Sequence, residues 1–211
     1  MKKTFAIGIP TINRLDLLHP SLLKYVADFP DITIYVIDNG NQRINNKIEH
    51  PNIVVIDFSF NLGVAGSWNA LCKEIFKNHN NALILNDDVY LGRKQGEVED
   101  MLVYSPSNLF VSEQGFCSFI MSEMIFNCIG KFDEAFFPAY FEDNDYLYRM
   151  KIAGLNTLYI KFLNPAIYNQ SSTIAKNPAL KNSIANRDYY ITKWGGEPNN
   201  ETFKKPFNIQ L

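Results

Sequence analysis

The chain has 211 residues, of which 46% are hydrophobic, 14% aromatic and 20% charged. This length and composition are typical of one large globular domain or two small ones, and they exclude disordered and low-complexity proteins. Twenty basic and twenty-two acidic residues give a formal net charge of -2. A charge so close to neutral excludes a broadly basic nucleic-acid-binding surface, so we expect no nucleic-acid partner.

Apolar residues are not concentrated in any one long segment. No run of about 18 apolar residues occurs, so we expect no transmembrane helix. The apolar stretch Phe5–Ile9 is too short for a signal peptide and stops at Pro10, so it predicts a strand. The three cysteines are odd in number and lie far apart among apolar residues, which favours buried thiols in the reducing cytoplasm.

The first half of the chain alternates strand and helix signals. In chain order we predict strand 5–10, helix 16–29, strands 32–37 and 53–56, helix 64–77 and strand 82–85. Short continuous apolar strands separated by helices predict a parallel sheet that is covered on both faces. The first half therefore indicates an α/β protein.

The second half is less regular. We predict helix 95–104, strand 116–121, helix 142–153, strand 157–160 and helix 183–194. Residues 197–211 are rich in Asn, Pro and Lys, which is typical of a tail or linker and would fit a domain from a longer polypeptide. We therefore expect one domain over 1–196 and a tail or linker over 197–211.

Several predicted strands end in acidic or amide residues. Asp38 and Asp57 each end a strand, and Asn86, Asp87 and Asp88 follow a third. In open α/β sheets ligands bind beyond the carboxyl ends of the strands, so these side chains are expected to converge on one crevice. The alternative is that they form turns and cap helices, and we favour that alternative for Asp57 alone.

The segment Asn86–Asp88 suits a divalent cation. Mg²⁺ and Mn²⁺ take carboxylate oxygens and usually share their site with substrate phosphates. Two adjacent aspartates repel each other unless something offsets their charge, which favours a metal over a solvated turn.

The densest acidic cluster is Glu142–Asp145, at the start of a predicted helix. Asp145 can pair with Arg149 four residues later, which gives it a structural role. On a helix, Asp143 and Asp145 point to opposite sides, so one of them can face a substrate while the other braces the helix.

The segment after the first strand contains no glycine-rich phosphate loop. Thr11 and Asn13 offer hydrogen bonds to a heterocycle or ribose, and Arg14 can meet a phosphate. A plain turn explains this segment equally well.

Taken in order, these segments resemble the family 2 glycosyltransferases with the GT-A fold. The likeness lies in Ile9–Arg14, Val36–Gly40, Asn61–Asn69, Leu85–Val89, Gly130–Glu134 and Phe141–Asp145. It spans residues 5 to about 155, and each motif alone is weak whereas the ordered set is specific. The resemblance implies a GT-A, Rossmann-like fold with a mixed, mostly parallel sheet flanked by helices. The length is also similar to the first domain of chlorella-virus glycosyltransferases that build capsid glycans, which implies a viral protein in the host cytoplasm.

The resemblance implies transfer of a sugar from a nucleotide-sugar donor to a hydroxyl of a glycan or glycoprotein acceptor. It places these residues at the nucleotide and donor: Pro10, Thr11, Asn13, Arg14, Asp38, Gly66, Asn69, Asn86 and Asp87. Asp38 would accept a hydrogen bond from the base ring N–H, which favours a UDP- or dTDP-sugar. Asp88 would bind the metal, Mn²⁺ or Mg²⁺, and Asp143 would be the catalytic base.

The sequence departs from the family pattern at two positions. Asn86 stands where an aspartate is usual, and no histidine follows His79, although many members use a late histidine as a metal ligand. Asn169 lies in that region and is the candidate replacement ligand. These departures leave two alternatives: a catalytically weak nucleotide-sugar or carbohydrate-binding module, and a nucleotidyltransferase. Glucose, galactose and rhamnose are all compatible with the motifs.

Overall fold

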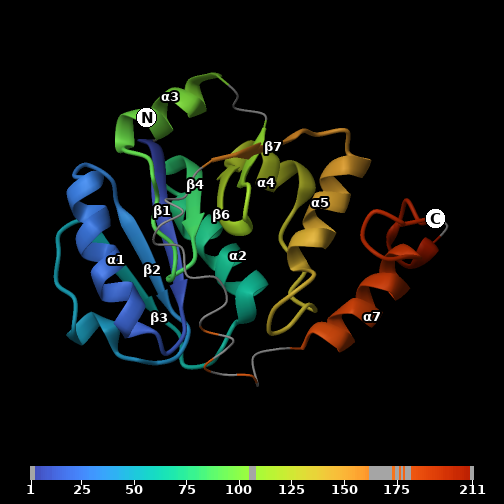
Figure 1. Ribbon diagram of the computed structural model, residues 1–211, viewed down its shortest axis with the longest axis horizontal. Helices are drawn as coiled ribbons and strands as arrows, with labels where there is room; N and C mark the ends of the chain where they lie inside the picture. The colour runs from blue at the N-terminus through green and yellow to red at the C-terminus, as the bar shows by residue number, and fades with distance from the viewer. Residues whose placement is uncertain are drawn as a thin grey trace.

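The computed structural model of the chain describes residues 3–104, 108–161, 173, 176, 178 and 182–209. Its centre is a seven-stranded sheet in the order β3-β2-β1-β4-β6-β5-β7 (Figure 1). The strands are β1 (Lys3–Thr11), β2 (Ile34–Asp38), β3 (Ile53–Asp57), β4 (His79–Leu85), β5 (Leu109–Ser112), β6 (Gly115–Ser122) and β7 (Thr157–Ile160). Only β6, among these described strands, runs antiparallel to its neighbours.

Helices cover both faces of this sheet. The described helices are α1 (Leu15–Asp28), α2 (Gly63–Ile75), α3 (Gln95–Tyr104), α4 (Glu123–Ile129), α5 (Glu142–Ile152) and α7 (Ser183–Trp194), with short 3₁₀ turns η1 (Ile44–Asn46) and η3 (Pro206–Asn208). One hydrophobic cluster joins α1 and α3 to one face, and a second joins α2, α4 and α5 to the other. The predicted mixed, mostly parallel α/β fold is confirmed.

Alternation along β1 shows why its sequence is apolar throughout. Phe5, Ile7 and Ile9 are buried in the cluster on the α1 side, whereas Ala6 is buried in the cluster on the α2 side. Because a strand in the middle of such a sheet meets helices on both faces, it needs apolar residues at successive positions rather than every second one.

The sequence did not predict β5 or α4. β5 has only four residues, and α4 has seven and begins directly after β6. The start of α4 carried a local signal, because Ser122 is its N-cap and its Oγ accepts a hydrogen bond from the Ile125 amide at 3.2 Å. Elements this short give too few residues to show a period.

The order of the strands defines a crevice between β1 and β4. The chain runs from β1 outward to β2 and β3, and it then returns to place β4 on the other side of β1. Ligands of open α/β sheets bind beyond the carboxyl ends of the strands at such a reversal. The segment Pro10–Arg14 contains the end of β1 and the turn after it, and Asn86–Asp88 follows the end of β4.

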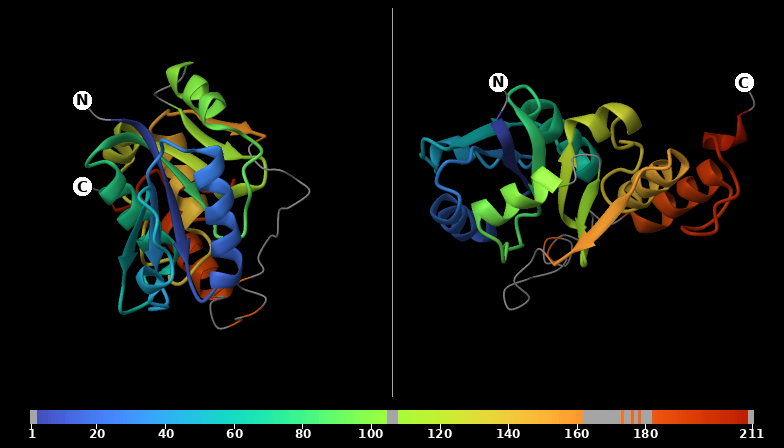
Figure 2. Two further views of the ribbon diagram at one scale, coloured as in Figure 1. Left: turned by 90° about the vertical axis from the view of Figure 1, so that its left-hand side faces the viewer. Right: turned by 90° about the horizontal axis from the view of Figure 1, so that it is seen from above.

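The C-terminal part of the chain packs on α5. Figure 2 shows α7 beside α5, at the end of the molecule away from β3. Phe136, Tyr148, Tyr190 and Trp194 form a separate apolar cluster between them. The Tyr148 hydroxyl donates a hydrogen bond to the Phe203 carbonyl at 2.7 Å, so part of segment 197–209 lies against α5. The predicted linker to a further domain stays a prediction.

None of the described helices is both long enough and apolar enough to cross a lipid bilayer.

Candidate active site

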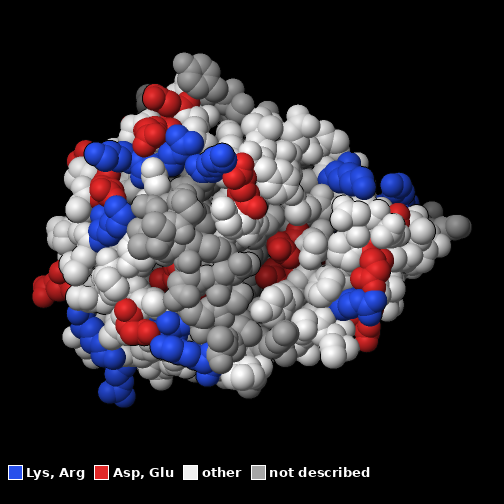
Figure 3. Space-filling view, in the orientation of Figure 1, with Lys and Arg blue, Asp and Glu red and all other residues white. Residues whose placement is uncertain are grey.

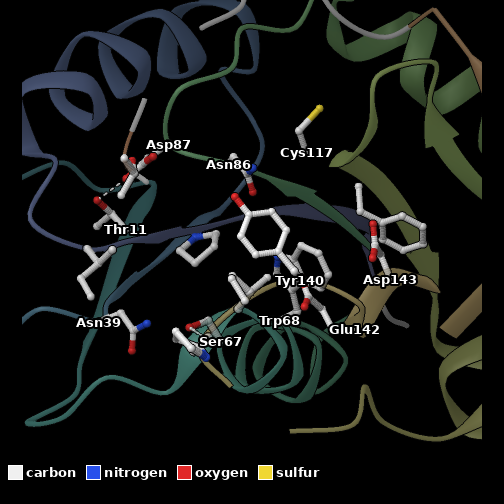
Figure 4. A pocket seen from close by; sticks show the side chains of 18 of the residues that line it. Thr11, Asn39, Ser67, Trp68, Asn86, Asp87, Cys117, Tyr140, Glu142 and Asp143 are labelled. Atoms are coloured by element: carbon white, nitrogen blue, oxygen red, sulfur yellow. Dashed lines mark hydrogen bonds between the residues drawn. The ribbon is translucent and has the colours of Figure 1, made fainter. Parts of the chain in front are cut away.

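A pocket of about 310 Å³ lies beyond the carboxyl ends of β1 and β4 (Figure 4). Its walls come from the ends of these strands, the first two turns of α2, the turn between β5 and β6, and the start of α5. Six of the predicted site residues line it: Pro10, Thr11, Asn86, Asp87, Asp88 and Asp143. The structure therefore brings together residues from three separate segments of the sequence.

Thr11 and Asp87 connect the two strand ends. The Thr11 hydroxyl donates a hydrogen bond to Asp87 Oδ2 at 2.7 Å, and both residues are buried. Burial raises the pKa of the Asp87 carboxyl to about 7, and the charge of Asp88 adds to this rise. The Thr11 hydrogen bond and the Arg14 guanidinium act in the opposite direction.

Arg14 is buried close to this carboxylate but does not line the pocket. Its Nε donates to Asp16 Oδ1 at 2.9 Å, and its Nη1 donates to Thr173 Oγ1 at 3.1 Å. Thr173 does line the pocket. Asn13 has φ of 56° and packs against Gly40, also outside the pocket lining. Their contacts with a donor stay predictions.

Asp38 ends β2 inside the protein rather than in the pocket. Its carboxylate accepts hydrogen bonds from the Gly40 amide at 3.2 Å, Gln42 Nε2 at 3.3 Å and the Ile44 amide at 3.3 Å. These bonds hold the turn that follows the strand. The predicted bond from a nucleobase to Asp38 stays a prediction.

The next residue, Asn39, is the one that reaches the pocket at the end of β2. Its Nδ2 donates to Asn61 Oδ1 at 2.7 Å, and its Oδ1 accepts from the Leu62 amide at 2.6 Å. Asn61 also lines the pocket. The sequence analysis noted the asparagine as part of a motif but did not select it as a site residue.

Gly66 and Asn69 lie on α2 but are not among the lining residues. Asn69 Oδ1 accepts from the Phe132 amide at 2.9 Å, and its Nδ2 donates to the Phe132 carbonyl at 2.9 Å and to Glu134 Oε1 at 2.8 Å. The Asn69 side chain thus ties α2 to the segment before α5. Its predicted role at the nucleotide stays a prediction.

Other residues of α2 face the pocket. They are Gly63, Val64, Ser67 and Trp68. Val64 and Trp68 lie four residues apart in the predicted helix 64–77, and this helical spacing indicates an apolar face without showing that the face borders a cavity near its N-terminal end.

Glu142 and Asp143 enter the pocket from the start of α5. Figure 4 shows them on the side of the view opposite Thr11 and Asp87. The Asp143 side chain is half-buried, its Oδ1 accepts a hydrogen bond from the Asn144 amide at 2.8 Å, and burial raises its pKa. Glu142, which the sequence analysis did not select, is 5% exposed, and burial together with Asp143 raises its pKa to about 8.

Asp145 points away from the pocket. Its carboxylate accepts from Arg149 Nε at 2.8 Å and from Trp194 Nε1 at 2.9 Å, and it pairs with Lys193 Nζ at 2.6 Å. The predicted Asp145–Arg149 pair is therefore confirmed, and Asp145 does brace the helix.

The turn between β5 and β6 supplies a wall that the sequence did not predict. Gln114, Gly115, Phe116 and Cys117 line the pocket. The Asn86 amide donates to the Cys117 carbonyl at 2.9 Å, which places this hairpin beside the end of β4. Because β5 was missed, the hairpin was not recognised.

The pocket is acidic. Asp87, Asp88, Glu142 and Asp143 line it, and none of the described lining residues is a lysine or arginine. Figure 3 shows acidic atoms in a hollow near the middle of one face, with basic side chains mostly around the periphery. An anionic ligand such as a nucleoside diphosphate would be repelled here unless a cation offset part of this charge.

The described residues fit a metal that is shared with a ligand rather than one enclosed by the protein. Among the parts of the chain that the structure describes, no group of three or more His, Cys, Asp and Glu residues could hold a metal ion. Asp87 and Asp88 supply two adjacent carboxylates, and Mg²⁺ commonly takes one or two carboxylates together with substrate phosphates. The candidate ligand Asn169 lies outside the described residues.

Comparisons with known proteins give matches among solved structures. No family model matches the sequence, and no curated protein matches it. A mannosyltransferase from Pyrobaculum calidifontis in complex with GDP-Man and Mn²⁺ has a TM-score of 0.60 at 10% identity, over 76% of this chain and 55% of that chain. This chain therefore spans only about half the length of that enzyme.

Two further structures match over most of their length. The 4-diphosphocytidyl-2C-methyl-D-erythritol synthase from Anaerococcus prevotii has a TM-score of 0.56 at 10% identity, over 84% of this chain and 96% of that chain. A putative nucleotide-diphospho-sugar transferase from Desulfovibrio desulfuricans has a TM-score of 0.55 at 9% identity, over 87% of this chain and 90% of that chain. The chain has a GT-A-like fold. Family 2 membership and a viral origin stay predictions.

Proposed function

We propose that the chain is a divalent-metal-assisted glycosyltransferase that moves a sugar from a nucleotide-sugar donor to an acceptor hydroxyl. One observation supports this most strongly: Asp143 lines the same pocket as Asp87 and Asp88, at the strand reversal of a GT-A-like fold. This arrangement supplies a carboxylate pair for the diphosphate end of a donor and a separate carboxylate for the acceptor.

Asp143 is the proposed base. As the acceptor oxygen bonds to the anomeric carbon, the bond from that carbon to the diphosphate oxygen breaks and the acceptor proton passes to Asp143. A base works best when its pKa approaches the working pH, and burial raises the pKa of Asp143 in that direction. A positioned base of this kind contributes about 10²–10⁴-fold to the rate.

Asp87 and Asp88 are the proposed holders of Mn²⁺ or Mg²⁺. Such an ion, when bound, acts as a Lewis acid that stabilises the negative charge of the departing diphosphate. Thr11 fixes one face of the Asp87 carboxylate through its 2.7 Å hydrogen bond, and the buried Arg14 nearby lowers the pKa of Asp87. These two residues keep the carboxylate oriented and partly charged before a cation binds.

The donor is a UDP- or dTDP-sugar by resemblance, and the acceptor is a hydroxyl of a glycan or glycoprotein. The mannosyltransferase of similar fold was crystallised with GDP-Man and Mn²⁺. Since Asp38 already accepts three internal hydrogen bonds, the donor panel should include guanine as well as uracil nucleotides.

Calorimetric titration with UDP, dTDP and GDP, with and without Mn²⁺, tests the nucleotide site. We expect binding of at least one nucleotide that Mn²⁺ tightens. In the Asp88→Ala variant, Mn²⁺ should no longer tighten nucleotide binding. In the control variant Asp100→Ala, on the exposed side of α3, Mn²⁺ should still do so. If no nucleotide binds in either condition, the donor assignment fails.

Release of free nucleotide from a panel of nucleotide sugars tests the chemistry. Asp143→Asn should lower turnover by about 10²–10⁴-fold while the affinity for the nucleoside diphosphate stays unchanged. Turnover at the wild-type rate would show that Asp143 is not the base.

A nucleotidyltransferase is the second candidate, because the match to the diphosphocytidyl synthase covers 96% of that chain. Such an enzyme would release pyrophosphate from CTP or UTP in the presence of a sugar phosphate, and a glycosyltransferase would not. A chain that binds nucleotide sugars but shows neither reaction would instead be a binding module of the same fold.

A further inference from the structure

Two residues that line the pocket each have a buried polar atom with no hydrogen-bond partner among the described residues. These atoms are Nε1 of Trp68 and Oε2 of Glu142. Both residues line the pocket, and they are only 3% and 5% exposed. Leaving a buried donor or acceptor without a partner is costly, so two such atoms on residues that line one cavity point to a ligand.

Neighbouring aromatic rings hold the Trp68 side chain. The centroid of its ring lies 5.8 Å from the ring centroid of Phe116 and 5.0 Å from those of Phe119 and Phe132. With its ring packed on several sides, the indole has little freedom to turn its N–H toward another partner.

The backbone of the two residues before Glu142 positions the second of these atoms, Oε2 of Glu142. Tyr140 and Phe141 both have positive φ, 82° and 75°, which is uncommon for aromatic residues and is a strained conformation. Asn186 Nδ2 of α7 donates to the carbonyl of Ala139 at 2.8 Å and to that of Tyr140 at 3.1 Å. The surrounding structure thus maintains a strained turn that delivers Glu142 to the pocket.

The chemistry of the two groups is complementary to a hydroxyl. Burial and the neighbouring Asp143 raise the pKa of Glu142 to about 8, against the opposing effect of the Glu142 and Tyr140 backbone amides. Near pH 7 a protonated carboxyl offers both a donor and an acceptor, and the Trp68 indole adds a donor. A neutral acid also avoids repelling an anionic ligand, and Tyr140 and Phe116 supply aromatic surface for the faces of a sugar ring.

We propose that Glu142 and Trp68 form a binding subsite for a sugar hydroxyl beside Asp143. The proposal rests on the proposed function, since it deepens the account of the same pocket. The donor sugar and the acceptor sugar carry the same hydroxyl chemistry, so the experiment has one arm for each.

The first arm measures the affinity of UDP-glucose, UDP-galactose and GDP-mannose relative to UDP and GDP, all with Mn²⁺. The second arm measures binding of the methyl glycosides of glucose, galactose and mannose by saturation-transfer NMR, with and without UDP. Both arms compare the wild type with Glu142→Met, which keeps the side-chain length but removes the polar atoms, and with Glu142→Gln, which keeps an acceptor and a donor. Glu99→Met, on α3 and outside the pocket lining, is the matched control.

We expect Glu142→Met to lower the affinity for the nucleotide sugars or for the glycosides by at least about tenfold. The affinities for UDP and GDP should change by less than about twofold. Glu142→Gln should stay within about threefold of wild type, which a loss of packing alone would not explain. A loss confined to the nucleotide sugars identifies the donor sugar as the occupant, and a loss confined to the glycosides identifies the acceptor sugar.

Equal binding by Glu142→Met and the wild type in both arms would overturn the proposal, as would wild-type protein that binds no sugar in either arm. Failure of the proposed function gives a different result, in which UDP and GDP do not bind at all. Glycoside binding that Glu142→Met abolishes would then preserve the subsite without the nucleotide-sugar function.

Discussion

The carboxylates on the two sides of the first turn of α5 differ in their bonding partners. On one side Asp145 is fully buried and bonds to Arg149, Lys193 and Trp194 at 2.6–2.9 Å. On the pocket side Glu142 has an oxygen without a partner among the described residues, and burial raises the pKa values of both Glu142 and Asp143.

The difference separates the charge that holds the helix from the charge that is available to a ligand. A buried carboxylate that bonds to cations stabilises the surrounding structure, whereas burial of a carboxylate that lacks a cationic partner lowers the stability of the fold. Sites that are poised for chemistry often have such a stability cost. The predictions below test whether the two sides differ as strongly as their contacts indicate.

The largest effect is expected on the bonded side. Asp145→Asn removes the charge that faces Lys193 and Arg149, and breaking a buried pair in this way costs about 3–5 kcal/mol. We expect urea titration to show a fall of that size in the free energy of unfolding. Asp28→Asn, which removes the partly exposed surface pair with Lys24, is the control and should change the free energy of unfolding by less than about 1 kcal/mol. Similar losses in both variants would contradict the comparison.

The next effect has the opposite sign and lies on the pocket side. The folded-state pKa of Glu142, about 8, is above the ordinary value of 4.5, so the folded protein binds the proton more tightly than the unfolded chain. Wild-type stability should therefore fall between about pH 4.5 and pH 8, and Glu142→Gln should remove this loss. We expect the variant to be more stable by about 4 kcal/mol at pH 8 and equal to the wild type near pH 4. Urea titrations at several pH values measure this difference. If the free energies of unfolding of the wild type and the variant change in parallel from pH 4 to pH 8, Glu142 is not held in its neutral form.

The smallest effect concerns the link from α5 to the C-terminal segment. Tyr148→Phe removes the donor that bonds to the Phe203 carbonyl, so we expect a loss of about 1 kcal/mol in the free energy of unfolding. Limited proteolysis should also cut near residue 203 more quickly in the variant. Tyr159→Phe, on an exposed tyrosine of β7, is the matched control. If both variants behave as the wild type, segment 197–209 does not depend on this bond.

The central elements of the fold were predictable because their physical cause is local. The apolar runs that became β1, β2 and β4 are visible in the sequence, since each of these strands is buried on both faces. The short β5 and α4 lacked enough residues to show a period, and with β5 the hairpin at Gln114 was also missed.

The site was predictable where the residue type is itself unusual for its position. Asp87, Asp88 and Asp143 were selected because carboxylates after an apolar strand, or grouped at a helix start, suggest chemistry, and all three line the pocket. Asp38 follows the same pattern, yet its carboxylate is used by the amides of the next turn. The sequence does not distinguish these cases, because the outcome depends on where the following loop places its N–H groups.

Glu142 and Trp68 were missed for a related reason. An acidic residue at a helix start and an aromatic residue on an apolar stripe both have ordinary structural explanations. Their selection required knowing that one polar atom of each side chain is buried beside a cavity with no described partner, which is a property of the tertiary structure.

The hydrogen bonds from α7 to the pocket wall bear on how the protein can be shortened. Asn182 and Asn186 donate to the carbonyls of Phe137, Ala139 and Tyr140, which belong to a segment more than forty residues earlier in the chain. A fragment that ends before Asn182 would keep the whole sheet and every pocket carboxylate, but it would lose the amides that steady the turn before Glu142. Expression fragments and fusion proteins designed around this fold should therefore retain α7, even though none of its described residues lines the pocket.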